Sequence, residues 1–248
     1  MLTKANVVES AAYLKEKLPF VPEIALVLGS GIGPLADEVE NPTYVPYGEI
    51  PHFKVSTAPD HAGRMVCGTL AGRRVICMQG RLHGYEGYAP DEVAYPVYVL
   101  KELGVEALVV TNASGGINTG YHAGDFMLIT DHINMTGKSP LTGKNDPELG
   151  TRFPDMTFAY SRELGEKALQ AAADCGLKLH QGIYCGVNGP QFETPAGDSH
   201  VPHARRGCGR HVHRVRGHCG RALRSAARRY CHDHQYGGRR AYAAALGR

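Results

Sequence analysis

The feature of this chain that most restricts its fold is a short apolar run that ends abruptly in small residues. Residues 108–110, Leu-Val-Val, have the composition of a buried β-strand. They lead directly into residues 111–116, Thr-Asn-Ala-Ser-Gly-Gly, where backbone N–H groups can approach a ligand closely. In α/β sheets, a loop of this kind at the carboxyl end of a strand is a common anion site. A plain tight turn is the alternative, and this segment alone does not decide between the two.

Apolar runs alternate with helical patterns over residues 1–196, which predicts an α/β domain with a largely parallel sheet. Helices are expected at residues 7–18, 94–103 and 162–175. Strands are expected at residues 24–28, 64–70, 74–78, 108–110, 126–129 and 181–187. Loops are expected at residues 44–57 and 131–153.

Composition limits where such a protein works. The 248 residues contain no apolar run of about 18, so no membrane span is expected. Lys4, Glu9, Lys15 and Glu16 recur at helical spacing near the N-terminus, which is not the pattern of a secretory signal. The seven cysteines lack paired spacings and indicate free thiols in a reducing compartment. We therefore expect a cytoplasmic protein.

The average composition hides a break near Ala196. Residues 197–248 contain twelve arginines, no lysine and only two acids, Asp198 and Asp233, for a net charge of +10. Because the whole chain carries +3, residues 1–196 carry −7. The segment after the break has no Ile, Phe or Met, so it has too few apolar side chains to build a core. The chain is therefore divided into an α/β domain at 1–196 and an anomalous tail at 197–248.

One glycine-rich loop suits a bound phosphate. Residues 29–33, Gly-Ser-Gly-Ile-Gly, follow a predicted strand and precede a short helix, so backbone N–H groups and the Ser30 hydroxyl can hold an anion. Pro34 stands where the third glycine of a dinucleotide fingerprint belongs, which argues against a dinucleotide-dependent enzyme. A glycine turn without a ligand is the alternative.

The loop at residues 79–88 gathers side chains of the kinds that bind anions and sugars. Arg81 can grip an oxyanion with two N–H donors, and His83 can add another donor. Tyr85 offers a hydroxyl on a flat apolar ring, which suits a sugar. His61 is a further candidate in a second polar loop. Solvated surface loops are the alternative explanation.

An aromatic residue and a carboxylate stand side by side at Phe192 and Glu193, after the last predicted strand. A purine or another flat heterocycle needs an aromatic face for stacking and an acceptor for its ring N–H donors. A core Phe beside a helix-capping Glu is the structural alternative.

The order of these segments resembles the trimeric purine nucleoside phosphorylases over about residues 5–196. The matching segments are residues 29–31, 61–64, 79–87, 111–116, 145–146, 152–154 and 189–194. The resemblance implies an α/β fold with a central mixed β-sheet, partly closed into a barrel and flanked by helices. It also implies a homotrimer.

The resemblance assigns roles to individual residues. By resemblance, phosphate is held by Ser30, His61, Arg81, His83 and the backbone of Ala113. The nucleoside is held by Tyr85, Asn112, Phe192 and Glu193, with Phe153 reaching the site of a neighbouring subunit. His83 and Glu193 would be the catalytic residues, and the pair Phe192-Glu193 favours the 6-oxopurine nucleosides inosine and guanosine.

The implied reaction is the reversible phosphorolysis of purine ribo- and deoxyribonucleosides to the free base and (deoxy)ribose 1-phosphate. The enzyme must place phosphate against C1′ while charge moves onto the purine, so positioning and electrostatic stabilisation carry most of the acceleration. Inorganic phosphate is a substrate, and no metal or organic cofactor is implied.

After Ala196 the resemblance stops. The family's Gly-Ala-Asp-Ala-Val-Gly-Met-Ser-Thr and Ile-Thr-Asn segments, which supply a phosphate-binding Ser and a purine-binding Asn, are missing. We hypothesise a frameshift. When the last two bases of each codon are joined to the first base of the next, residues 205–213 can read as the first segment, and residues 233–236 as Ile-Thr-Asn-Met. The chain as written is therefore expected to be unstable and to turn over little substrate.

Two other interpretations of the tail stay open. Its arginines can bind nucleic acid or an acidic membrane surface, which would make the protein an inactive phosphorylase-like module that binds phosphate or nucleic acid. A zinc site is the second possibility, although no C-x₂-C pair supports it. Its candidate ligands lie in His211-Val212-His213 and Cys231-His232-Asp233-His234.

Overall fold

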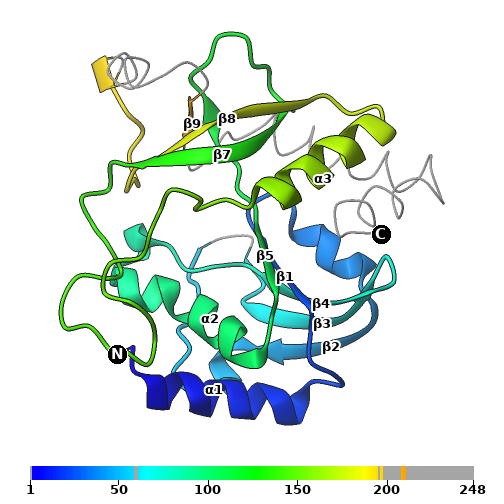
Figure 1. The fold of residues 1–248 in the computed structure, drawn as a ribbon, viewed down its shortest axis with the longest axis vertical. Helices are drawn as coiled ribbons and strands as arrows, with labels where there is room; N and C mark the ends of the chain where they lie inside the picture. Colours follow the sequence, from blue (N-terminus) through cyan, green and yellow to red (C-terminus); the bar gives the residue numbers. More distant parts are fainter. Residues whose placement is uncertain (1, 59–60, 195, 198–207, 211–248) are drawn as a thin grey trace. The chain divides into compact units, whose positions relative to one another are not determined.

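The computed structural model of the chain describes residues 2–58, 61–194, 196–197 and 208–210. They divide into two compact units, drawn together in Figure 1. Unit 1 comprises Met1–Asn112 and Lys138–Pro154, and unit 2 comprises Ala113–Gly137 and Asp155–Arg248. None of the described helices has the length and hydrophobicity needed to cross a bilayer.

Unit 1 is built on a five-stranded mixed sheet with the strand order β2-β3-β4-β1-β5. Its strands are β1 (Ile24–Leu28), β2 (Glu40–Pro46), β3 (Arg64–Leu70), β4 (Arg73–Gln79) and β5 (Ala107–Val110). Strand β1 runs parallel to both β4 and β5, whereas β3 runs antiparallel to β2 and β4. The α-helices are α1 (Lys4–Lys17) and α2 (Pro90–Leu103), and the short 3-10 helices are Gly33–Glu38, Tyr47–Glu49 and Gly84–Glu86.

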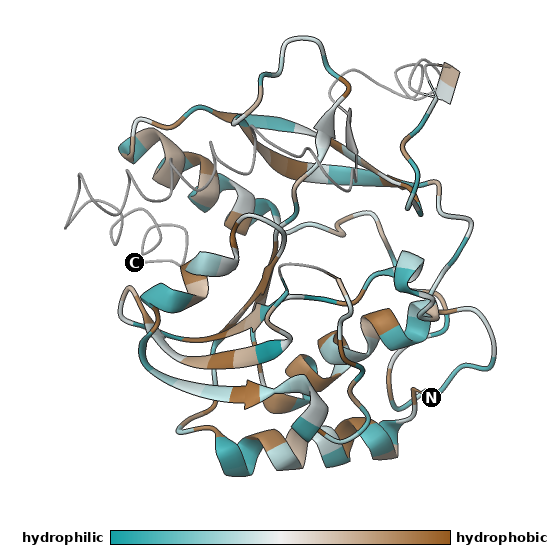
Figure 2. Cartoon of the chain, turned by 180° about the vertical axis from the view of Figure 1, so that it is seen from behind, coloured by the Kyte–Doolittle hydropathy of each residue, from teal (hydrophilic) through white to brown (hydrophobic). Residues whose placement is uncertain are grey.

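The core of unit 1 follows from apolar spacing. All five residues of β1 are buried, because this strand has a neighbour on each side. Helices α1 and α2 lie side by side and bury Leu14 and Val99 in one cluster with Ile76 of β4. Hydrophobic and hydrophilic residues alternate along α1 in Figure 2, as a helix with one buried face requires.

Unit 2 contains a four-stranded mixed sheet in the order β6-β9-β8-β7 and one α-helix. The strands are β6 (Gly115–Gly116), β7 (Phe126–Asn134), β8 (Leu179–Gly186) and β9 (Cys208–Arg210), and the helix is α3 (Arg162–Asp174). Strands β7 and β8 are parallel, and so are β8 and β9. The Ser161 side chain caps α3 by accepting from the N–H of Leu164, and Gly176 follows the helix with a φ of 65°.

The α/β fold with mixed sheets and flanking helices is confirmed, as are the three helices and the approximate positions of the expected strands. Two expectations were wrong. Strand β2 was not expected, and its last residues were placed in a loop, while β7 continues to Asn134 through residues also placed in a loop. Both segments are largely exposed and rich in polar residues, so they lack the apolar pattern by which a buried strand is recognised. Each described sheet is open, with β2 and β5 as the edges of one and β6 and β7 as the edges of the other, so partial barrel closure is not seen in these residues.

The burial expected for β5 was also wrong. Leu108, Val109 and Val110 retain 38%, 36% and 48% of their accessible surface. The physical reason is position, because β5 pairs with β1 on one side only. An apolar composition is typical of a central strand, yet here it stands at the edge of the described sheet.

Candidate functional site

Three neighbouring strands of unit 1 end at the same edge of its sheet. Because β4, β1 and β5 are parallel neighbours, their carboxyl ends lie together. The loop after β1 carries Ser30, the loop after β4 carries Arg81, and Asn112 follows β5. The topology therefore brings together three of the segments that the sequence singled out for phosphate and nucleoside binding.

The Thr111 hydroxyl joins two of these loops. Thr111 Oγ1 accepts from the N–H of Gly29 at 3.0 Å and donates to the carbonyl of Val27 at 2.9 Å. The carbonyl of Thr111 accepts from Arg81 Nη1 at 2.7 Å, which holds the guanidinium against the end of β5. A Cβ atom on Gly29 would stand 2.6 Å from that carbonyl oxygen, so only glycine fits there. Sequence reasoning missed this role of Thr111.

The ring of His61 contacts the backbone of Arg81. Its Nδ1 lies 2.8 Å from the N–H of Arg81 and 3.1 Å from the carbonyl oxygen of the same residue. The N–H can only donate and makes the shorter contact, so we assign Nδ1 as the acceptor of a neutral ring. Gly80 has a φ of 109°, and a Cβ there would lie 2.8 Å from His61 Cβ. The glycine thus makes room for the histidine.

His83 is held by a buried carboxylate. Glu86 Oε1 accepts from His83 N–H and from His83 Nδ1, both at 2.8 Å. Glu86 Oε2 accepts from Thr57 N–H at 2.6 Å and from Thr57 Oγ1 at 2.8 Å. The side chains of His83 and Glu86 keep only 5% and 2% of their accessible surface. One carboxylate therefore fixes His83 and also ties down the segment that leads towards the His61 loop.

The hydrogen bonds around Glu86 keep it ionised. Burial by itself would raise its pKa, but the bonds from Thr57 and His83 outweigh burial and hold the pKa at about 2. The carboxylate makes Nδ1 of His83 a donor. His83 Nε2 lies 3.5 Å from Arg81 Nε, and the nearby Tyr85 phenol has its pKa raised to about 12 by burial and by the charge of Glu86. Sequence reasoning gave Glu86 no role, although its position three residues after His83 matches a capping box, which the structure shows.

Unit 1 thus brings three aromatic rings and a guanidinium together. The ring of His83 lies 5.0 Å from that of His61 and 4.8 Å from that of Tyr85, measured between centroids. Arg81 supplies a fixed positive charge and several N–H donors next to these rings. Such a group can hold a tetrahedral oxyanion, and the Tyr85 ring can cover a sugar.

The remaining predicted residues lie in other segments. Ala113, Phe192 and Glu193 belong to unit 2, where Phe192 is 52% exposed and the other two are half-buried. Phe153, in the second segment of unit 1, is 86% exposed. The candidate zinc ligands of the tail, named as an alternative, lie outside the described residues. Within the described part, no group of three or more His, Cys, Asp or Glu residues is arranged to hold a metal ion.

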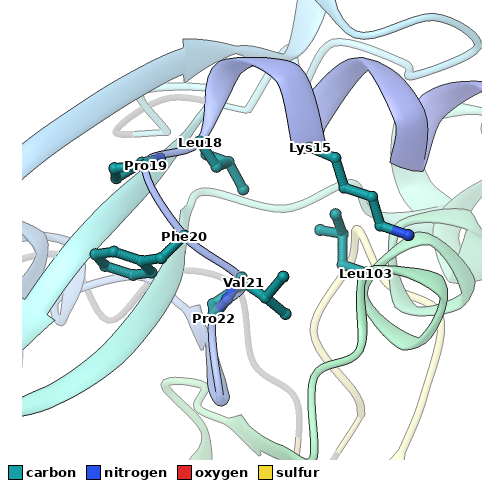
Figure 3. Close-up of a pocket in the computed structure, with 7 residues that line it drawn as sticks. All are labelled: Lys15, Leu18, Pro19, Phe20, Val21, Pro22 and Leu103. Carbon is teal, nitrogen blue, oxygen red and sulfur yellow. The ribbon is translucent and has the colours of Figure 1, made fainter.

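One cavity of unit 1 can be set aside. It has a volume of about 330 Å³ and is lined by the turn that joins α1 to β1, with Phe20 and Leu103 among its apolar residues. Figure 3 shows Lys15 as the charged side chain of its lining. A hollow of this composition offers a phosphate no set of hydrogen-bond donors.

The chain is similar to known proteins over most of its length. Residues 23–208 match the model of the Phosphorylase superfamily. Over 193 residues the chain is 53% identical to purine nucleoside phosphorylase 1 of Bacillus subtilis, which corresponds to 78% of this chain and 71% of that protein. It is 46% identical to the purine nucleoside phosphorylase of Mus musculus over 75% of this chain and 66% of that one. A crystal structure of Schistosoma mansoni purine nucleoside phosphorylase superposes with a TM-score of 0.80 at 38% identity, covering 91% of this chain and 83% of that one.

Proposed function

This chain belongs to the purine nucleoside phosphorylases, within the phosphorylase superfamily, and from this premise we propose which of its residues carry the family's reaction. The reaction is phosphorolysis, in which phosphate displaces the purine from C1′ of the nucleoside. The bond from C1′ to nitrogen breaks, a bond from C1′ to a phosphate oxygen forms, and the electron pair leaves with the base. The products are the free purine and a pentose 1-phosphate.

Unit 1 would supply the phosphate half of the reaction. The observation that carries this proposal is the network in which Arg81, His61 and His83 are each held by backbone or carboxylate partners. Groups fixed before the substrate arrives need no reorganisation when charge develops. The Ser30 hydroxyl would add a further phosphate ligand, and Tyr85 would cover the ribose.

The base half would be supplied by Asn112, Phe192 and Glu193. The half-exposed Phe192 offers a face for stacking, and the Glu193 carboxylate can accept from a purine ring N–H. This acceptor suits the 6-oxopurines of inosine and guanosine. Glu193 would stabilise the departing base, and His83 would act on the phosphate side.

We propose a cytoplasmic homotrimer that works in purine salvage. The support for assembly is Phe153, which exposes 86% of its surface beside Arg152. An aromatic side chain this exposed gains by insertion into a neighbouring subunit. Sedimentation of the purified protein would test the trimer.

Phosphate binding tests the proposed site most directly. Replacing Arg81 with alanine removes the charge-assisted donors, so phosphate affinity should fall about 10-fold or more. Arg74→Ala is the matched control. Arg74 lies on β4, the strand that leads to Arg81, and it forms an ion pair with Glu23. Calorimetric titration with inorganic phosphate measures the phosphate affinity of both variants. An unchanged affinity in Arg81→Ala would rule out the proposed site.

Inosine cleavage tests the activity of the chain as written. We expect little turnover, because residues 197–248 lack the phosphate Ser and purine Asn segments that the family resemblance implies. Normal turnover from a preparation of verified mass would contradict this expectation. If instead the protein cleaves no nucleoside but binds nucleic acid with an affinity that falls steeply with salt, the basic tail would define an inactive binding module.

A further inference from the structure

The side chain of Tyr47 is buried, and its hydroxyl is bonded to the loop that carries Arg81. It keeps 1% of its accessible surface, and the hydroxyl donates to the carbonyl of Gly80 at 2.7 Å. Burial raises the pKa of this phenol well above its ordinary value, so it stays a neutral donor. The sequence placed Tyr47 in a loop and gave it no role.

Two further contacts fix where this hydroxyl stands. Tyr47 N–H donates to the carbonyl of Gly63 at 2.9 Å, and Gly63 N–H donates to the carbonyl of Gln79 at 2.9 Å. The ring of Tyr47 packs against that of Phe53, with 5.8 Å between the centroids. Tyr47 is thus joined to the end of β4 through its backbone and through its hydroxyl. The Gly80 carbonyl is therefore held by a residue from a distant part of the chain.

The peptide group between Gly80 and Arg81 is bonded on both sides. Its carbonyl accepts from Tyr47, and its N–H donates to Nδ1 of His61 at 2.8 Å. Because a peptide group is planar, a bond that fixes the carbonyl also fixes the direction of the N–H. Hydrogen bonds in such a series also polarise and strengthen one another. The Tyr47 hydroxyl therefore acts on His61 through one rigid unit.

The ring of His61 faces two alternative partners in the backbone of Arg81. Its Nδ1 lies 2.8 Å from the N–H of Arg81 and 3.1 Å from the carbonyl oxygen. When Nδ1 accepts from the N–H, a neutral ring carries its proton on Nε2. When Nδ1 donates to the carbonyl, Nε2 becomes an acceptor and cannot donate to an anion. The direction of the Arg81 N–H therefore decides which tautomer is favoured.

We propose that Tyr47 is a positioning residue for His61, and that its hydroxyl holds the Gly80–Arg81 peptide so that the His61 ring keeps its proton on Nε2. A hold from outside the loop is needed because Gly80, with a φ of 109°, restricts its own backbone weakly. The consequence for catalysis rests on the proposed function, in which His61 donates to phosphate.

Tyr95 of α2 offers a matched control in the same apolar cluster. It is 4% exposed, its hydroxyl donates to the carbonyl of Asn6 at 2.8 Å, and its ring lies 5.7 Å from that of Phe53. The partners of this hydroxyl, Asn6 and Ser10, belong to α1 rather than to the loops of the site. Loss of either tyrosine hydroxyl removes a buried hydrogen bond, but only Tyr47→Phe releases the Gly80 carbonyl.

Nitrogen NMR of the full chain labelled with ¹⁵N-histidine tests the proposal without any substrate. The imidazole shifts report which ring nitrogen carries the proton, and His61→Gln identifies the His61 signals among those of the thirteen histidines. The native protein and Tyr95→Phe should show the Nε2 tautomer, whereas Tyr47→Phe should show signals of a ring protonated on Nδ1. An unchanged tautomer in folded Tyr47→Phe would overturn the proposal. A native His61 protonated on Nδ1 would overturn it without any variant.

Titration with inorganic phosphate separates this inference from the proposed function. The Kd for phosphate should rise about 5-fold in Tyr47→Phe and change by less than about 2-fold in Tyr95→Phe. If the native chain binds no phosphate but the tautomer shifts in Tyr47→Phe alone, the proposed function fails and the role of Tyr47 stands. If all three proteins bind phosphate equally and share one tautomer, the role of Tyr47 fails and the proposed function stands.

Discussion

The two units both contain a mixed sheet but bury its strands to very different extents. In unit 1, β1 is wholly buried and β3 and β4 bury most of their side chains. One face of β3 and β4 shares an apolar cluster with α1 and α2. In the described part of unit 2, Ala171 and Cys185 are the buried apolar side chains, although β7 and β8 pair over eight positions. Apolar cover therefore differs between the two sheets. The contrast teaches that the hydrogen-bond network around Arg81 and His83 lies in the better-packed unit.

A matched pair of leucine variants should show this difference most strongly. Leu14 of α1 is fully buried, whereas Leu164 of α3 is 37% exposed. Leu14→Ala should lower the free energy of unfolding by about 2–5 kcal/mol through lost contacts and a cavity. Leu164→Ala should cost about 0.5 kcal/mol. Urea unfolding measures the free energy of unfolding of both variants. Equal losses would show that the difference in packing does not affect stability.

A pair of glycine variants sharpens the comparison at the site. Gly80 and Gly176 both have positive φ, at 109° and 65°, but only Gly80 has a neighbour that an added Cβ would strike. Gly80→Ala should cost about 2–3 kcal/mol, since backbone strain adds to the clash with His61. Gly176→Ala should cost about 1 kcal/mol from strain alone. Thermal unfolding would report the difference, and a larger cost at Gly176 would contradict the geometry described for His61.

Replacement of Glu86 should have a smaller effect on stability and a specific effect on the site. Both oxygens of Glu86 accept hydrogen bonds, and the amide nitrogen of glutamine cannot accept. Glu86→Gln should therefore cost about 1.5 kcal/mol and weaken phosphate binding through His83. Glu163→Gln is the control, because Glu163 forms an exposed ion pair with Lys167 in unit 2. Phosphate affinity that is equal in the two variants would exclude a positioning role for Glu86.

The smallest expected effect is a loss of stability at low pH. The pKa of Glu86 is about 2 in the folded protein, against an ordinary value of 4.5. Its contribution to stability is therefore fully present above pH 4.5 and is lost as the pH falls towards 2. The difference in unfolding free energy between the native chain and Glu86→Gln should shrink over that interval. A difference that stays constant between pH 5 and 3 would show that Glu86 is not held as a carboxylate.

Much of the fold could be predicted because its signals are local. The five apolar residues of β1, the amphipathic pattern of α1 and the Gly176 stop after α3 each act within a few residues. Arg81 and His83 could be named as candidates for the same reason, since their chemistry is visible in the loop itself, and their roles stay predictions. Phe192 and Glu193 were named in the same way, and their roles stay predictions.

Other features could not be predicted because they depend on contacts between distant segments. Thr111 organises the site through hydrogen bonds with Gly29 and Arg81, and Glu86 does so through hydrogen bonds with Thr57. These partners are distant in the sequence, so the residues that flank Thr111 and Glu86 do not reveal them. The exposure of β5 depends on which strand stands beside it, and its composition gave the opposite expectation.

The sequence by itself determined the family and the alternation of strands and helices, and it named candidate side chains for phosphate and purine whose roles stay predictions. It did so because propensity, periodicity and side-chain chemistry are properties of short segments. Only the tertiary structure decided which of those side chains are held in place, which carboxylate holds them, and which strand is left at an edge. Hydrogen bonding and burial of this kind arise when parallel strands bring distant loops to one edge of a sheet, so no single segment encodes them.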